Sequence, residues 1–111
     1  LIPIMEPSNQ QEAYDMTRYA FDLSEQMGTP VLLRITTRLA HSRSGVEPRE
    51  TKAENAIRLP EDKRQFVLLP AIAKKRYKLL LEKQNAFEEA SDNSSFNQYI
   101  DGAANILFLE R

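Results

Sequence analysis

The stretch that decides the fold reads GTPVLLRI, from Gly28 to Ile35. Its second part, Val31 to Ile35, is short and almost continuously apolar, which is typical of a strand covered on both faces in a parallel or mixed sheet. Gly28 can adopt the left-handed conformation that ends a helix, and Pro30 prevents the helix from continuing. The stretch therefore predicts the end of a helix, a tight connection and a buried strand.

A helix is predicted directly upstream of this stretch. Ser8 followed by Gln11 matches a capping box, in which side chains serve the free amides of the first helical turn. An apolar stripe with spacings of three and four residues follows, formed by Ala13, Met16, Ala20, Leu23 and Met27. A helix followed by a buried strand is half of a βαβ unit. We find no strand before the helix, and we interpret the sheet as larger than this chain.

Both ends of the chain are apolar. The sequence opens on Leu1 to Met5 without an initiator methionine, and Ile106 to Leu109 is a strand-like run followed only by Glu110 and Arg111. A finished domain usually closes with polar residues. We interpret the chain as a piece of a longer polypeptide. The alternatives are a truncation artefact and an edge strand that closes a small sheet.

The remainder of the chain contains one further strong helix signal. Residues 36–62 are polar and predict a long surface connection, with a possible helical turn at 53–59. Phe66 to Leu69 is apolar and expected to be extended, because Pro70 disfavours helix in the residue before it. Pro70 can begin a helix that runs to about Ser91. Its expected inward residues are Ala73, Tyr77, Leu80, Leu81 and Phe87. A turn at 92–95 and short strands at 96–100 and from Asn105 complete the prediction.

Composition restricts the function classes. The chain has 111 residues, 15 Lys plus Arg, 16 Asp plus Glu, a net charge of -1 and no cysteine. This length holds one domain at most. The absence of a positive field argues against nucleic acid or an anionic membrane as partner, and the absence of cysteine excludes disulfides and iron–sulfur ligation by this segment. With no membrane span or signal peptide in the sequence, we expect a cytoplasmic location.

Polar residues directly after the apolar run are candidate site residues. Thr37, Arg38 and His41 follow the predicted strand, and ligands gather at the carboxyl ends of strands in open α/β sheets. Hydroxyl, guanidinium and imidazole groups suit an anionic ligand such as a carboxylate or phosphate. The alternative is a polar loop that turns in solvent, and spacing alone favours that alternative. No carboxylate lies near His41 in the sequence, so spacing predicts no catalytic triad.

The second predicted helix carries a basic cluster near its start. Lys74, Lys75 and Arg76 lie there with Lys78, while Glu88 and Glu89 lie near its end. This is the reverse of what the helix dipole favours, so the basic end invites an acidic partner. One hypothesis is therefore a stand-alone interaction module that uses residues 74–78. The alternative is a solvated helix face.

Several blocks together resemble a known enzyme family. The order and spacing of Glu6-Pro7-Ser8, Gln11 to Met16, Ala20 to Glu25, Pro30 to Arg34, Thr36 to Arg38 and His41-Ser42 resemble the alpha subunits of indolepyruvate:ferredoxin oxidoreductases. These belong to the thiamine-diphosphate-dependent 2-oxoacid:ferredoxin oxidoreductases. The likeness is specific over residues 1 to about 44 and looser through Pro70-Ala71, the basic helix start and Phe96-Asn97. Arg38 and His41 match an Arg-x-x-His pattern of the pyruvate-using members, here with Leu39 and Ala40 between them.

The resemblance implies an α/β fold and a division of the chain. Residues 1–44 would be the C-terminal part of a thiamine-diphosphate pyrimidine-binding domain, 45–69 a linker, and 70–111 a helix and short strands leading into the next domain. Thr37, Arg38 and His41 would line or support the substrate side of the cofactor cleft. Lys74, Lys75 and Arg76 remain the candidates for contact with a partner.

The resemblance also implies the chemistry of a parent enzyme. That enzyme would oxidatively decarboxylate aryl pyruvates such as indolepyruvate to acyl-CoA and pass electrons through 4Fe-4S clusters to ferredoxin. It would use thiamine diphosphate, Mg and CoA, and it would include a beta subunit. The residues that activate and bind the cofactor are expected outside this segment. We therefore expect the isolated segment to bind none of these groups, to be inactive and to self-associate.

Overall fold

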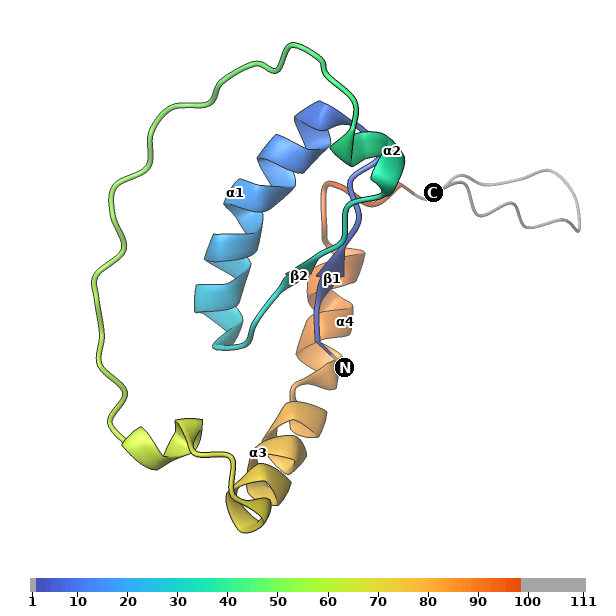
Figure 1. Ribbon diagram of the computed structural model, residues 1–111. Helices are drawn as coiled ribbons and strands as arrows, with labels where there is room; N and C mark the ends of the chain where they lie inside the picture. The colour runs from blue at the N-terminus through green and yellow to red at the C-terminus, as the bar shows by residue number, and fades with distance from the viewer. Residues whose placement is uncertain (1, 99–111) are drawn as a thin grey trace, which may run out of the picture.

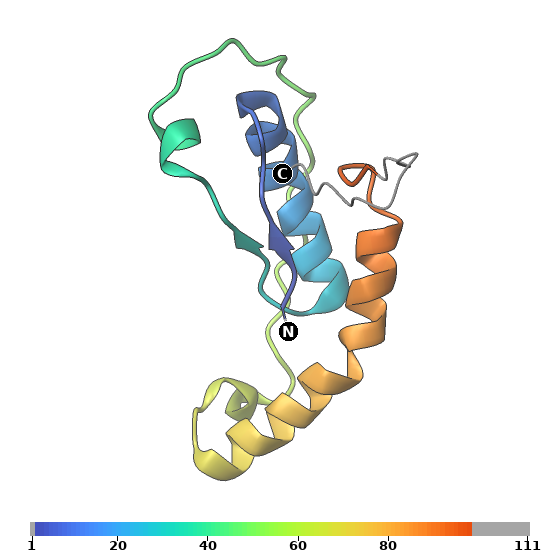
Figure 2. The same cartoon turned by 90° about the vertical axis from the view of Figure 1, so that its right-hand side faces the viewer.

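The computed structural model describes residues 2–98, and within them a small α/β arrangement is built on one parallel strand pair. β1 (Ile4–Met5) and β2 (Leu32–Leu33) pair in parallel, with Ile4 opposite Leu32 and Met5 opposite Leu33. Helix α1 (Gln10–Met27) connects them and lies along the pair (Figures 1 and 2). The α/β class predicted from the sequence is confirmed.

The prediction that no strand precedes the first helix is wrong. The amide of Leu32 donates to the carbonyl of Pro3 at 2.9 Å, and the amide of Arg34 donates to the carbonyl of Met5 at 2.8 Å. β1 has two residues, too few for a periodicity signal, and only its pairing with β2 identifies it as a strand. The chain therefore contains a complete, short βαβ unit.

The prediction that the strand at 31–35 is covered on both faces is also wrong for the described residues. Helix α1 covers one face, where Met5 and Leu33 are partly buried, whereas Ile4 is 57% exposed and Leu32 48% exposed. A parallel pair needs cover on both faces to be stable. The uncovered face is thus a surface that this segment does not bury by itself.

Helix α1 follows the predicted stripe, but its N-cap lies one residue after the predicted cap. Met16 and Leu23 are each 6% exposed and form the apolar core of residues 2–98. The N-cap is Asn9, whose side chain accepts a hydrogen bond from the amide of Glu12, so the predicted Ser8–Gln11 box is wrong. Ser8 instead donates to the Glu12 carboxylate. An Asn directly before the helix competes equally well for the cap position.

The helix stop at Gly28 is confirmed. Gly28 has φ 54° and ψ 43°, and its amide donates to the carbonyl of Ser24. Lys83, far along the chain, adds a second cap because its Nζ donates to the Met27 carbonyl at 2.6 Å and to the Gly28 carbonyl at 3.3 Å. A cation at the carboxyl end of a helix is favourable for the helix dipole.

After residue 41, the described residues form a long irregular connection that is followed by helices (Figure 1). Residues 42–60 contain no helix or strand, so the predicted turn at 53–59 is wrong, while the predicted surface connection is confirmed. Phe66 ends a short 3-10 helix, η1 (Lys63–Phe66), and is not extended as predicted, whereas Val67 and Leu69 are extended. The predicted helix is interrupted at Lys83 and forms α3 (Pro70–Glu82) and α4 (Gln84–Asp92).

Two further predictions about this region need correction. Tyr77 and Leu81, expected to point inward, are 55% and 44% exposed, because α3 extends away from α1 and packs against η1 (Figure 2). Residues 96–98 form no strand, because Phe96 lies in a turn and contacts the ring of Tyr19 at 5.6 Å between centroids. The rest of the strand predicted at 96–100 and the one from Asn105 lie outside the described residues.

Candidate functional site

The candidate site lies at the carboxyl end of the two strands. The chain leaves β2 and after three residues forms a short helix, α2 (Thr37–Ala40), where the sequence predicted a loop. Thr36 caps this helix because its Oγ1 accepts a hydrogen bond from the amide of Leu39 at 3.3 Å. Figure 1 shows α2 beside the N-terminal end of α1. A ligand at this edge would meet α2 first.

The three predicted site residues lie on one helical turn. Thr37 and Arg38 belong to α2, and His41 follows it and donates its backbone amide to the carbonyl of Thr37 at 3.1 Å. All three are exposed. Arg38 and His41 are three residues apart and thus neighbours on a helix surface. Within residues 2–98 the side chains of Arg38 and His41 make no hydrogen bond or ion pair, so both side chains are accessible to a ligand.

Gln10 links α1 to this turn and was not identified from the sequence. Its Nε2 donates to Oγ of Ser42 at 2.6 Å, and that hydroxyl donates to the carbonyl of Leu39 at 2.8 Å. The first residue of α1 therefore holds the end of α2. The two residues are far apart in sequence, so spacing carries no signal for this contact.

The electrostatics of this edge favour an anion near Arg38 rather than at the start of α1. The amide of Glu12 is already bonded to Asn9, and the Glu12 carboxylate places a negative charge in the first turn of α1. Beside it, Glu6 pairs with Arg34. Arg38 is left as a guanidinium available for a bidentate contact with a carboxylate or phosphate.

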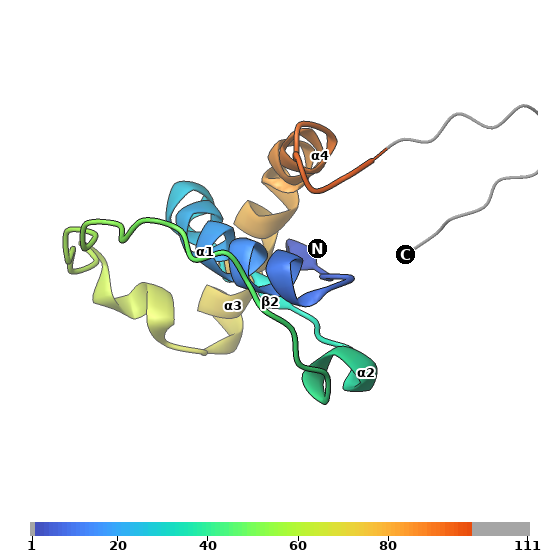
Figure 3. The ribbon, with the colours of Figure 1, turned by 90° about the horizontal axis from the view of Figure 1, so that it is seen from above.

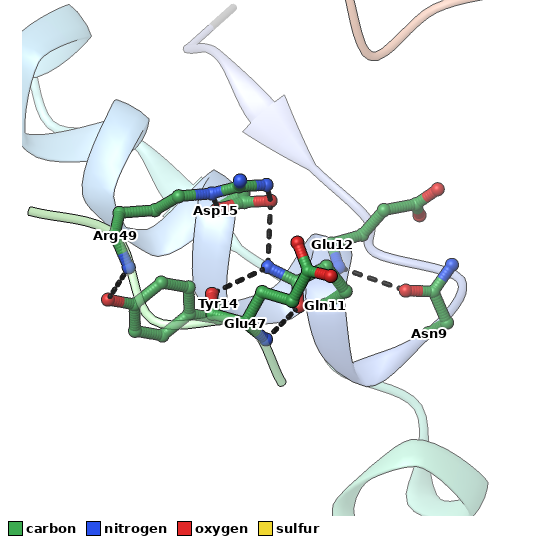
Figure 4. A network of polar contacts seen from close by, with 7 residues as sticks. All are labelled: Asn9, Gln11, Glu12, Tyr14, Asp15, Glu47 and Arg49. Carbon is green, nitrogen blue, oxygen red and sulfur yellow. Dashed lines mark hydrogen bonds and ion pairs between the residues drawn. The ribbon is translucent and has the colours of Figure 1, made fainter. Parts of the chain in front are cut away.

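A second polar network fastens the chain that leaves the site (Figure 4). Gln11 exchanges hydrogen bonds with the backbone of Glu47, and Arg49 binds the carboxylate of Asp15 through Nε at 2.9 Å and NH2 at 2.8 Å. The hydroxyl of Tyr14 accepts from the amide of Arg49 at 3.1 Å. We call residues 47–52 the strap. It lies along the polar side of α1.

The ion pair between Arg49 and Asp15 is expected to weaken at low pH. The hydrogen bond from Arg49, assisted by Gln11, lowers the pKa of Asp15 from its ordinary 3.8 to about 2. Because the folded-state pKa is depressed, the pair stabilises the strap above about pH 4, and this stabilisation is lost as the pH falls through 2. We expect an NMR titration to show this low pKa in the 111-residue chain. In Arg49→Gln the Asp15 pKa should return toward 3.8, while Arg43→Gln should leave it low. An unchanged value in Arg49→Gln would contradict the pairing.

The basic cluster lies far from this edge. Lys75 and Arg76 line a shallow hollow between α3 and η1, together with Asp62, Arg64, Gln65, Ile72 and Leu79. The backbone amide of Arg64 and its side chain lower the pKa of Asp62 there. Lys74 does not line this hollow. The structure thus separates Lys74 from Lys75 and Arg76, and contact of these residues with an acidic partner stays a prediction.

The donor atoms of the described residues do not fit the metal groups of the parent chemistry. Within residues 2–98, no three His, Asp or Glu side chains lie close enough to hold a metal ion, and the whole chain lacks cysteine. Magnesium diphosphate needs a set of oxygen ligands, and iron–sulfur clusters need thiolates. In the same part of the chain, no helix combines the length and apolarity needed to cross a bilayer.

The structure is thus an α/β segment in which a turn that could bind an anion follows a parallel strand. The proteins similar to this chain are oxidoreductase subunits. No protein-family profile and no solved structure match the chain. The chain is 41% identical to indolepyruvate oxidoreductase subunit IorA of Pyrococcus abyssi in an alignment that covers 91% of this chain. It is 39% identical to the subunit of the same name from Methanothermobacter marburgensis over 90% of the chain. For Archaeoglobus fulgidus the identity is 36% over 95%.

These similarities confirm the resemblance derived from the sequence blocks. The chain is similar to one segment of the indolepyruvate oxidoreductase IorA subunits, and it spans 16% of the length of the Pyrococcus abyssi and Methanothermobacter marburgensis relatives. The matched region includes nearly all of the chain. It therefore extends beyond residues 1–44, where the blocks are most specific.

Proposed function

We propose that this chain is a segment of an enzyme that oxidatively decarboxylates aryl pyruvates, in which α2 forms part of the substrate side of the cofactor cleft. The observation that carries the proposal is the exposed turn with Thr37, Arg38 and His41 at the carboxyl end of a parallel strand pair. The relatives are named indolepyruvate oxidoreductase subunits, which supports this substrate class. A 2-oxoacid carries a carboxylate, which a guanidinium recognises by two parallel hydrogen bonds.

The fold supports the proposal that this segment is part of a larger domain. The βαβ unit within residues 1–44 has an uncovered apolar face at Ile4 and Leu32, as expected of the last part of a pyrimidine-binding domain whose sheet continues elsewhere. Residues 45–69 then form the linker, which the strap holds against α1. Residues 70–111 lead into the next domain.

Other parts of the parent enzyme would supply the redox chemistry. We propose that thiamine diphosphate, Mg, 4Fe-4S clusters and CoA are held outside this segment, and that a beta subunit and ferredoxin are the partners. Thiamine diphosphate held elsewhere in the parent enzyme would supply the carbanion stabilisation that decarboxylation requires. The residues of this chain would hold the substrate carboxylate at Arg38 and place the Thr37 hydroxyl and His41 imidazole beside it. By itself the segment would not turn over substrate.

The test uses the full-length enzyme that contains this segment. Arg38→Ala should lower kcat/KM for indolepyruvate by about tenfold, mostly through KM, because a hydrogen-bonded charge contact is lost. Arg43→Ala is the matched control, since Arg43 is an exposed arginine shortly after α2 and should have no effect. An unchanged kcat/KM in Arg38→Ala would remove α2 from the substrate cleft.

A further inference from the structure

Helices α3 and α4 share one open face that the proposed function does not use. Along the two helices a set of residues recurs at alternating spacings of four and three, formed by Lys74, Lys78, Leu81, Asn85, Glu88 and Asp92. Such spacing places side chains along one side of a helix. Lys83, between the two helices, keeps a right-handed backbone at φ -83° and ψ -7°, so the spacing continues across the bend. All six residues are exposed.

The side of the two helices that lies about 100° around from the open face is turned toward the rest of the described chain. Its side chains are partly buried and are Ala73, Leu80, Gln84, Phe87 and Ala90. Figure 3 shows α4 lying beside α1, where Lys83 reaches the end of α1. The open face therefore points away from the contacts that the described residues make. Tyr77, 55% exposed, is four residues before Leu81 and thus its neighbour on the helix surface.

Charge is divided along this open face. It is basic at Lys74 and Lys78 and acidic at Glu88 and Asp92, and within residues 2–98 none of these four side chains forms an ion pair. Neither α3 nor α4 has an acidic residue in its first turn or a basic one in its last. Basic charge near the start and acidic charge near the end oppose the helix dipole. A single copy thus leaves both ends of the face unsatisfied.

We propose that this face binds the same face of a second copy of the chain, with the helices antiparallel and a two-fold axis at Lys83. In this register Lys74 lies opposite Asp92 of the second copy and Lys78 lies opposite its Glu88. Leu81 meets Asn85 of the second copy. A two-fold interface must be complementary to itself, and the basic and acidic ends of this face meet that condition.

The same register satisfies both helix dipoles. The carboxylates of the second copy lie near the start of α3, and its lysines lie near the end of α4. A purely acidic partner would complement Lys74 and Lys78 but would be repelled by Glu88 and Asp92. Charge complementarity therefore selects a second copy over an acidic protein. Exposed ion pairs are individually weak, so the dimer is weak and sensitive to salt.

The experiment measures self-association of the 111-residue chain by analytical ultracentrifugation. The unmodified chain should form dimers at about 0.2 mM protein and lose them as NaCl rises from about 50 to 500 mM. Lys74→Glu/Lys78→Glu and Glu88→Lys/Asp92→Lys should each weaken self-association by about tenfold or more, because like charges then face each other. Mixing these two variants should restore a one-to-one dimer, because every acidic residue of one variant then faces a lysine of the other.

The matched control lies on the same helix. Lys75→Glu/Arg76→Glu makes the same change in charge, but these residues face η1, so dimerisation should be unchanged. Far-UV circular dichroism verifies that each variant keeps its helices, and restoration on mixing does not depend on that comparison. A monomeric unmodified chain, an equal effect in the control, or no restoration on mixing would overturn the proposal. None of these outcomes depends on the enzymatic function.

Discussion

Leu23→Ala is expected to lower the free energy of unfolding of the 111-residue chain by about 3 kcal/mol. Leu23 is 6% exposed and is, with Met16, the apolar core that joins α1 to the strands. Truncation removes buried surface and leaves a cavity that a helix against two short strands cannot fully close. Since small domains are marginally stable, a loss of this size shifts most of the chain toward the unfolded state. Urea unfolding followed by circular dichroism measures the effect.

Phe21→Ala is the control for this prediction. Phe21 lies on the same helix but is 69% exposed, so its removal takes little surface out of the core. We expect a change within about 0.5 kcal/mol. Equal losses in the two variants would show that the helix is not anchored through the Leu23 side.

Gly28→Val is expected to cost about 2 kcal/mol. The reason is conformational, because Gly28 has φ 54° and β-branched residues rarely adopt positive φ. Space is not the limit, since an added Cβ would meet only the Lys83 Nζ at 3.7 Å. The variant should unfold at lower urea and lose the end of α1, together with the contact through which Lys83 caps the helix.

Gly45→Val is the control for this prediction, because it replaces a glycine that does not have positive φ. An added Cβ at Gly45 meets no atom within 4 Å, and this glycine does not have positive φ. We expect a change within about 0.5 kcal/mol. If Gly28→Val were as mild as Gly45→Val, the helix end would not depend on the left-handed residue.

The predictions that succeeded depend on interactions close in sequence. The stripe of α1, its end at Gly28 and the start of α3 at Pro70 follow from helical periodicity and from the backbone preferences of glycine and proline. Local rules were insufficient where two residues competed for one role. Ser8 and Asn9 are both good caps, and only the folded chain shows that Asn9 serves the amide of Glu12.

Predictions about the site divide in the same way. The sequence placed Thr37, Arg38 and His41 directly after a strand, and the structure places them on one turn at its carboxyl end. The supports of that turn were missed. Gln10 binds Ser42, and Asp15 binds Arg49 across a separation of 34 residues. Such contacts leave no periodic pattern.

By itself the sequence determined an amphipathic helix, its stop, an apolar run after it and a match to one segment of an oxidoreductase subunit. Only the tertiary structure decided that Ile4 and Met5 are a strand, that α1 covers one face of the pair, and that the helix after Pro70 bends at Lys83. The physical reason is range. Helix signals arise from neighbours within one or two turns, whereas strand pairing, burial and the Lys83 cap depend on groups brought together from distant parts of the chain.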